Sequence, residues 1–387
     1  MDTPDEEKAP RDEEIASRAR AFAPVVWLIG KVQSGKSSIV RALTQSTQAE
    51  IGRGFEACTR FSRVFDFPAE APIIRFLDTR GVGEAGYDPA ADIAFCEERA
   101  HLVIAVAKAA DMEQRPLLSV LSAIRERHPD WPIVVAQTSL HELYAENEGH
   151  ALPYPFGRHT LGATPLHRAL AHQRTLFAGV DADLPFVPID FTLATDGLEP
   201  ADYGREALIA ALIAHAPKAV AAVLEGLPAA APGTTQKSAD PHVLGYALAA
   251  GASDAVPVAG AAVVPMVQAA MLRKLAQLFD REWDRQAIAE FAGAIGAGTL
   301  LRVATGFGVR QLVKLVPVYG QSVGAAAAAA ASFATTFAMG KAAAYYLSRR
   351  QGSARAEEIA RVYREALSEA FALSKTKPLD TGLGKPP

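Results

Sequence analysis

The sequence is poor in cysteine, and its two cysteines, Cys58 and Cys96, lie far apart in the chain. Neither belongs to a C-x-x-C pair, which excludes a disulfide framework and a zinc site of the usual cysteine spacing. Because such sparing use of cysteine fits a reducing compartment, we expect a cytoplasmic protein.

The chain also lacks an excess of positive charge and an apolar N-terminal segment. Its formal net charge is −4 and its pI is about 6.2, so no overall basic field would attract a polyanion. Nucleic acid is therefore not an expected partner. Residues 1–20 are crowded with acids and bases and contain no apolar core of the kind that a signal peptide requires.

Length and patterning predict two domains of different kinds, because 387 residues exceed what one hydrophobic core usually serves. From residue 24 to residue 218, short apolar runs alternate with helical patterns, which is typical of an α/β domain with a mainly parallel sheet. The expected central strands are 25–29, 73–77, 102–107, 133–136 and 186–189, with 59–67 as an antiparallel edge strand.

The remaining segments differ from this domain in composition. We expect an N-terminal extension at 1–23, a helix end and linker at 219–242, a helical domain at 243–375 and a tail at 376–387. The stretch 228–241 is rich in Ala, Pro, Gly and Ser, as linkers are. The helical domain has no strand pattern and contains long runs of small residues such as 324–331.

Two stretches of the helical domain carry no charge. They run between Asp254 and Arg273 and between Lys314 and Lys341, and both are long enough to span a bilayer. They consist largely of Ala, Gly, Ser and Thr and include prolines and glutamines, a composition that favours close helix packing. A membrane-facing hairpin, which would associate the protein with the inner membrane, and a bundle of packed helices both remain open.

Three weaker patterns lie in the same domain. Residues 256–260 and 316–320 resemble each other, which is explained either by two related helical hairpins or by chance in a biased composition. A stripe of apolar residues would serve either a lipid surface or a bundle core; its members are Met271, Leu275, Leu278 and Phe279. A closing helix is expected to pack through Ile359, Val362, Tyr363, Ala366, Leu367, Ala370 and Phe371.

Residues 30–37 read G-K-V-Q-S-G-K-S and satisfy the pattern GxxxxGK(S/T) between an expected strand and a helical pattern. The glycines let the backbone wrap around phosphates with its N–H groups pointing inward, and the helix N-terminus adds partial positive charge. We expect Lys36 to reach the β- and γ-phosphates and Ser37 to ligate Mg²⁺. The predicted nucleotide contacts in this loop are Gly30, Lys31, Val32, Gln33, Ser34, Gly35, Lys36, Ser37 and Ser38.

A second motif follows the expected strand 73–77. Residues 78–81 read D-T-R-G, so that Asp78 would hold a metal-bound water and Gly81 would meet the γ-phosphate. Thr59, at the start of the edge strand, is the candidate switch threonine that completes the Mg²⁺ shell and senses the γ-phosphate. The predicted metal ligands are Ser37, Thr59 and Asp78. The predicted catalytic residues are Lys36, Thr59, Arg80 and Gly81.

The order of P-loop, switch threonine and D-x-x-G after a hairpin strand resembles the Era-like branch of small GTPase domains over residues 25–216. The second domain, with its D-A-V-P-V-A-G and K-L-V-P-V-Y-G-Q stretches, resembles an uncharacterised hydrophobic helical domain that bacteria attach to such GTPases. The resemblance implies a bacterial protein with a P-loop GTPase domain at 24–218, GTP as ligand or substrate, and Mg²⁺ as cofactor.

The resemblance further implies a guanine-recognition segment, (N/T)-K-x-D, whose Asp accepts hydrogen bonds from the base. The matching residues 138–141 read T-S-L-H, so Thr138 is a predicted nucleotide contact while the Lys and the Asp are missing, with Glu142 one residue beyond. A site without that carboxylate loses much discrimination against adenine. Val82 replaces a glutamine that often orients water, and Gln33 replaces an asparagine that binds activating potassium in some relatives.

Three functions follow from these features: a GTP-driven switch acting on a membrane or protein partner through 243–375, an ATP-using P-loop enzyme, and a scaffold that binds nucleotide only for structure. The absence of an Arg-rich lid and the D-x-x-G after a strand favour the first.

We expect slow hydrolysis, accelerated by homodimerisation or a partner. Arg80 would stabilise phosphoryl charge or pair with Glu84. The histidines His159, His167 and His172 have no recognised metal-ligand spacing.

Overall fold

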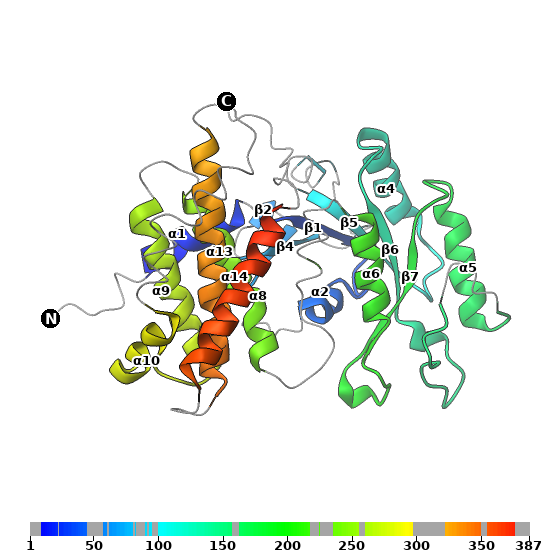
Figure 1. The fold of residues 1–387 in the computed structure, drawn as a ribbon. Coiled ribbons are helices and arrows are strands. Elements are labelled where there is room, and N and C mark those ends of the chain that lie inside the picture. Colours follow the sequence, from blue (N-terminus) through cyan, green and yellow to red (C-terminus); the bar gives the residue numbers. More distant parts are fainter. Residues whose placement is uncertain are drawn as a thin grey trace. The chain divides into compact units, whose positions relative to one another are not determined.

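The computed structural model of the chain describes residues 9–21, 23–44, 57–59, 62–79, 82, 90, 93–94, 100–156, 162–216, 224, 235–254, 260–296, 322–349 and 354–375. The chain divides into two compact units. The α/β unit comprises residues 24–66 and 74–230, and the helical unit comprises residues 1–23, 67–73 and 231–387. Figure 1 labels the elements of both.

The α/β unit is built on a seven-stranded sheet in the order β2-β3-β4-β1-β5-β6-β7. The strands are β1 (Val25–Gly30), β2 (Ala57–Thr59), β3 (Ser62–Phe67), β4 (Ile74–Thr79), β5 (Ala100–Lys108), β6 (Ile133–Thr138) and β7 (Phe186–Pro188). β1 pairs in parallel with β4 and β5, β6 pairs in parallel with β5 and β7, and β2 is antiparallel to β3. The predicted mainly parallel sheet with an antiparallel edge is confirmed, although the expected edge strand 59–67 is two strands, β2 and β3.

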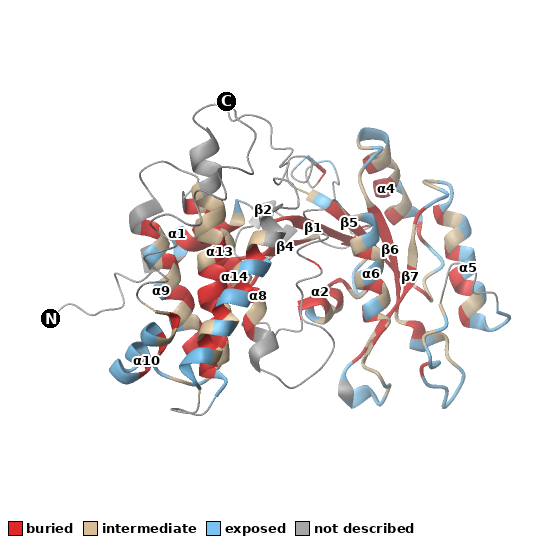
Figure 2. Ribbon diagram, viewed as in Figure 1, coloured by how far each residue is buried: buried red, intermediate tan, exposed pale blue. Residues whose placement is uncertain are grey.

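The central strands of this sheet are buried apolar runs, and helices cover both of its faces. Every residue of β1 and β6 is buried, as central parallel strands require (Figure 2). The helices are α2 (Lys36–Thr44), α4 (Arg115–Arg127), α5 (Pro165–Phe177) and α6 (Arg205–His215). α2 and α6 contact each other, whereas the core on the other face contains apolar residues of α4 together with Phe177 of α5. α5 begins after Thr164, whose hydroxyl accepts a hydrogen bond from the backbone of His167.

The described residues from 235 onward are helical or lie in short connections, without a strand. The helices of the helical unit are α1 (Ala9–Arg20), α8 (Thr235–Asp254), α9 (Gly260–Leu278), α10 (Arg285–Ile295), α13 (Ser322–Leu347) and α14 (Ala356–Lys375). α13 packs against α8, α9 and α14, while α1 packs against α8. A helical second domain is therefore observed, and α1 from the expected N-terminal extension belongs to it through Ile15 and Ala19.

α8 begins at Thr235, inside the stretch expected to be a linker. Its sequence carries Pro241 within the helix, and Ala239 and Val243 on either side of this proline are fully buried. Burial against neighbouring helices thus outweighs the low helix propensity of this stretch. The similar segments 256–260 and 316–320, apart from Gly260 at the start of α9, lie outside the described residues.

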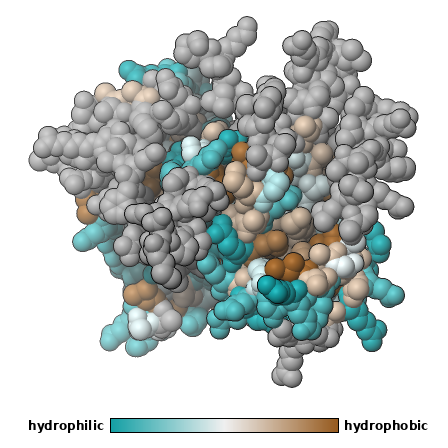
Figure 3. Space-filling model, turned by 90° about the vertical axis from the view of Figure 1, so that its left-hand side faces the viewer, coloured by the Kyte–Doolittle hydropathy of each residue, from teal (hydrophilic) through white to brown (hydrophobic). Residues whose placement is uncertain are grey.

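The apolar stripe of α9 lies in the interior of the helical unit. Met271 and Leu275 are fully buried, and Leu278 and Phe279 pack against the same core. Mapped by hydropathy, the face shown in Figure 3 has hydrophobic areas between hydrophilic ones. No described helix combines the length and apolarity that crossing a bilayer requires. The burial of Met271 and Leu275 is what the bundle-core interpretation of this stripe predicts.

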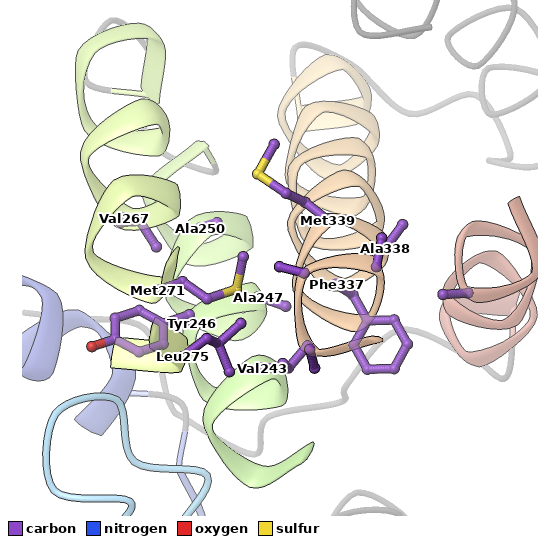
Figure 4. Packing of buried hydrophobic residues seen from close by; sticks show 14 of the residues in the cluster. Val243, Tyr246, Ala247, Ala250, Val267, Met271, Leu275, Phe337, Ala338 and Met339 are labelled. Carbon is purple, nitrogen blue, oxygen red and sulfur yellow. The ribbon is translucent and has the colours of Figure 1, made fainter. Parts of the chain in front are cut away.

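Side chains from three helices meet in that core (Figure 4). Val243, Tyr246, Ala247 and Ala250 come from α8, Val267, Met271 and Leu275 from α9, and Phe337, Ala338 and Met339 from α13. The closing helix α14 contributes Ile359, Tyr363, Ala366 and Ala370, all buried, with Leu367 and Phe371 packed beside them. Small residues let these helices approach closely: a Cβ added to Gly340 of α13 would lie 2.6 Å from a methyl of Val243.

Residues 67–73, which join β3 to β4, belong to the helical unit. Glu70 accepts a 2.7 Å hydrogen bond from Lys274 of α9 and lies 3.8 Å from His242 of α8. Burial raises the pKa of Glu70, but the hydrogen bond and charge of Lys274 outweigh it and hold this pKa below its ordinary value. Burial lowers the pKa of His242 to about 4, so its ring is neutral near pH 7. The single ion pair is therefore Glu70–Lys274.

Gly245 of α8 offers a test of this packing, since a Cβ at this position would lie 1.9 Å from the carbonyl oxygen of Ala71. Gly245→Ala should destabilise the protein by about 1–3 kcal/mol, because the clash is with backbone and must displace it. Gly293→Ala in α10 is the matched control: nothing lies within 4 Å of its added Cβ. That change should be neutral or stabilising by up to about 1 kcal/mol. Thermal unfolding followed by circular dichroism compares them, and equal melting of the two variants would contradict the packing.

Candidate functional site

The P-loop leaves β1 in a conformation that glycine makes accessible. A Cβ on Gly30 would lie 2.5 Å from both the Ser34 hydroxyl and the carbonyl oxygen of Val106 in β5. Gly35 has φ +96° and Gln33 has φ 58°, both in the left-handed region. The loop therefore turns sharply before α2, as a backbone that directs several N–H groups at one anion must.

Lys36 begins α2 and lies inside this loop, 9% exposed. Its ammonium donates hydrogen bonds of 3.0 Å to the carbonyl oxygens of Gly30 and Lys31 and lies 3.9 Å from Asp78 Oδ1. A buried ammonium needs such partners to offset its lost hydration. The two motifs predicted to act together, the P-loop and D-x-x-G, are thus brought together through Lys36 and Asp78.

Two of the predicted magnesium ligands, Ser37 and Asp78, lie on elements that contact each other, α2 and β4. Asp78 lies near the carboxyl end of β4, beside Leu28 of β1, and is 19% exposed, while Ser37 is exposed in the first turn of α2. Mg²⁺ prefers one or two protein oxygens together with waters and phosphates. Among the described residues no group of three or more His, Cys, Asp or Glu forms a denser metal site. The hydroxyl of Ser37 and the carboxylate of Asp78 are ligands of the kind that this ion takes.

The other predicted switch residues are placed only in part. Thr59 ends β2, where its backbone pairs with Ser62 of β3. Arg80 and Gly81 lie outside the described residues, as does most of the loop 45–58 and His159. Val82 is buried and donates a backbone hydrogen bond of 3.2 Å to Gly30, so its side chain belongs to the core of the unit.

Other loop residues have structural partners of their own. Lys31 forms a 2.9 Å ion pair with Asp111, whereas Val32 and Gln33 are exposed. The hydroxyl of Ser34 is buried and has no partner among the described residues. Ser38 lies half-buried in α2.

Thr138, at the end of β6, is hydrogen-bonded to the P-loop. Its hydroxyl donates a 2.7 Å hydrogen bond to the carbonyl oxygen of Ser34, and its side chain is the nearest group to a Cβ built on Gly35, at 3.5 Å. The hydrogen bond joins residues 104 positions apart in the sequence. The threonine retained from the recognition segment therefore contacts the P-loop itself.

The chain after Thr138 differs from the expected recognition segment. Ser139 has φ 56°, and a 3₁₀ turn, η1 (Leu140–Leu143), follows. His141 donates its backbone N–H to Asp190 of β8 (Asp190–Phe191) at 2.8 Å, and its Nδ1 lies 2.8 Å from the same carboxylate. Glu142 instead pairs with Lys108 at 2.6 Å. Glu142 is thus already engaged and does not stand in for the missing Asp.

Aromatic side chains enclose the buried carboxylate of Asp190. His150 stacks on Tyr203 of β9 (Asp202–Tyr203) with ring centroids 4.2 Å apart, and Tyr144 lies 2.8 Å from His150 through its hydroxyl. Burial lowers the pKa of His150 and raises that of Tyr203 to about 12, so both are neutral near pH 7. The resemblance to small GTPase domains implies a base-stacking loop near residues 188–191, which match it only approximately. No pattern in the sequence indicated that Tyr144, His150 and Tyr203 gather around Asp190.

The histidines of α5 belong to no group of three or more His, Cys, Asp or Glu within the described part of the chain. His167 bonds to the hydroxyl of Thr164, and His172 is exposed.

Residues 25–138 match the model of a family described as 50S ribosome-binding GTPase. With its P-loop after β1 and its mainly parallel sheet, this segment has the fold of a P-loop NTPase and resembles that GTPase family. The match spans β1 to Thr138 and ends before η1 and the helical unit. No curated protein sequence matches the chain.

Three solved structures are similar to part of the chain at low identity. One is the G domain of the T. maritima FeoB iron transporter, 16% identical, with a TM-score of 0.29, covering 50% of this chain and 98% of that one. Another is elongation factor SelB from Methanococcus maripaludis, 14% identical, with a TM-score of 0.29, covering 49% and 34%. A third is a GTP-binding protein from Sulfolobus solfataricus, 15% identical, with a TM-score of 0.28, covering 53% of each chain.

Removing the P-loop lysine tests the GTPase site directly. Lys36→Ala should weaken binding of a triphosphate about 10- to 150-fold, because hydrogen bonds to a charged group contribute about 1.5–3 kcal/mol. Lys341→Ala is the control, since this lysine pairs with Asp240 in the helical unit. Titration with a fluorescent GTP analogue measures both variants. Binding by Lys36→Ala within twofold of the unchanged protein would contradict the assignment.

The bond from Thr138 to the P-loop gives a second test. Thr138→Val keeps the shape but leaves the carbonyl of Ser34 without this donor, a loss of about 1–3 kcal/mol. Because phosphate binding requires an ordered loop, GDP affinity should fall about 5- to 150-fold. Thr175→Val removes a comparable hydroxyl bond, to Ala171 on α5, outside the site. Equal affinities in the two variants would show that Thr138 does not order the loop.

Proposed function

We propose that this protein is a slow, Mg²⁺-dependent GTPase switch whose helical domain, within residues 243–375, acts on a partner. The observation that carries the proposal is the approach of Lys36 to Asp78, because it brings the phosphate-binding and metal-binding motifs to one point. GTP would bind with its phosphates in the loop 30–37, and Ser37 and Asp78, with Thr59, would hold the metal. Hydrolysis to GDP would release these contacts to the γ-phosphate.

Slow turnover follows from the residues around the reacting phosphate. Val82 occupies the place of a water-orienting glutamine, and its buried side chain has no hydrogen-bonding group. GTPases without an activator turn over on the order of 10⁻⁴ to 10⁻² per second. A homodimer or a protein partner would supply the missing stabilisation, as arginine fingers do, with Arg80 as the candidate within the chain.

The helical domain is proposed to meet a protein partner or the surface of a membrane, including the inner membrane of a bacterium. The family description names the 50S ribosome. With a net charge of −4 the chain has no overall basic field for RNA, so we do not extend that partner to it.

Hydrolysis and metal dependence test the proposal together. The full-length protein should release phosphate from GTP at well below about one turnover per second, and chelation of Mg²⁺ should abolish release. Asp78→Asn should lower the rate at least about tenfold, since the metal loses a charged ligand. Asp240→Asn, in the helical unit, should leave the rate unchanged. A purified monomer that hydrolyses several GTP per second would sink the slow-switch proposal.

Two further measurements separate the other functions. Tighter binding of ATP than of GTP would favour an ATP-using enzyme. Identical protease cleavage of the loop 45–58 with GDP and with a GTP analogue would favour a scaffold that binds nucleotide only for structure. A third measurement, sedimentation of the full chain with anionic vesicles, distinguishes a membrane surface from a protein as the partner of the helical domain.

A further inference from the structure

His141 and Asp190 form a pair that the phosphate-binding machinery does not use. The carboxylate of Asp190 is 1% exposed and accepts both the backbone N–H of His141 and its ring Nδ1, at 2.8 Å each. The side chain of His141 is 39% exposed. The pair therefore combines a buried residue, Asp190, with a partly exposed one, His141, whose ring can be reached from solvent.

The hydrogen bonds decide which ring nitrogen of a neutral His141 carries the proton. An ionised carboxylate only accepts, so Nδ1 must be the donor to Asp190. A neutral ring with its proton on Nδ1 carries a lone pair on Nε2. The exposed half of the pair is then a single hydrogen-bond acceptor.

The backbone fixes this acceptor near the nucleotide site. Thr138 is bonded to the P-loop, and Ser139 turns the chain through a left-handed conformation. Leu140 is fully buried, which anchors η1 and leaves the next side chain, His141, partly exposed. Ligands of parallel α/β sheets bind at the carboxyl ends of the strands. β1 ends at this edge of the sheet and leads into the P-loop, and β6 ends at the same edge and leads into η1.

We propose that His141 determines base specificity by accepting one hydrogen bond, through Nε2, from N1–H of a 6-oxopurine, and that Asp190 is its positioning residue. The inference rests on the proposed function, because it assumes a GTP-class nucleotide in the site. Guanine offers two adjacent donors, N1–H and the 2-amino group. A carboxylate accepts both, whereas one imidazole nitrogen accepts one. The 2-amino group of guanine is therefore not read, while adenine presents a lone pair at N1 and is disfavoured.

Nucleotides that differ only in the base test this with the unmodified full-length protein. Labelled GDP is displaced by GDP, by IDP, which lacks the 2-amino group, and by ADP. We expect IDP and GDP to bind within about threefold of each other and ADP to bind at least about fivefold more weakly. IDP binding more than about tenfold weaker than GDP would overturn the inference alone, as would ADP binding equal to GDP. Failure of labelled GDP to bind would overturn the proposed function together with it.

Variants separate base recognition from a merely structural bond. His141→Asp combined with Asp190→Asn restores a carboxylate without placing two charges side by side, and should make GDP bind at least about tenfold more tightly than IDP. Asp190→Asn alone should change the ratio of ADP to GDP affinity at least about threefold, because Nδ1 then loses its charged acceptor. His172→Ala, on the exposed face of α5, is the control and should leave all ratios unchanged. If none of the ratios moves in the His141 and Asp190 variants, the pair only fastens η1 to β8.

Discussion

The parallel pairing of β1 with β4 on one side and β5 on the other is the constraint on which the site depends. This register sets Leu28 beside Asp78 and Gly30 beside Val106, so the carboxyl ends of three strands meet at one edge. The backbone of β5 comes so near Gly30 that a side chain there would meet the carbonyl of Val106. The P-loop therefore begins at a position where the sheet leaves no room for a side chain. Asp78 lies near Lys36 because β4, which carries it, is the strand next to β1.

Helix α2 connects this edge to the rest of the α/β unit and is fixed at both of its ends. At its start, Lys36 bonds to the loop carbonyls. At its end, the buried Arg205 of α6 donates hydrogen bonds of 2.6 and 3.3 Å to the carbonyl oxygens of Ala42 and Leu43. The last carbonyls of a helix lack partners within it, and a cation is favoured there by the helix dipole. Burial lowers the pKa of Arg205, whereas the charges of Asp202 and Glu206 raise it. An arginine side chain keeps its proton in proteins, so the cap is charged.

The parts of this structure that the sequence predicted are those encoded locally. Runs of buried residues such as those of β1 and β6 have few alternatives to a central strand, and the spacing of the P-loop is a single short motif. Contacts between distant residues left no such pattern: Arg205 caps a helix 162 to 163 positions away, and Asp190 holds His141 from 49 positions away. The low-charge runs of the helical half were ambiguous because small apolar residues suit lipid contact and close helix packing alike.

The hairpin formed by β3 and β4 contributes residues to both compact units. Its tip, residues 67–73, belongs to the helical unit, while its strands continue into the α/β unit. β4 leads to Asp78, and β3 pairs with the strand that ends at Thr59. Ala71 lies against Gly245 without room for a methyl group, and Glu70 is held by Lys274. Since packed interiors do not deform continuously, a displacement of residues 67–73 within the helical unit would break these contacts.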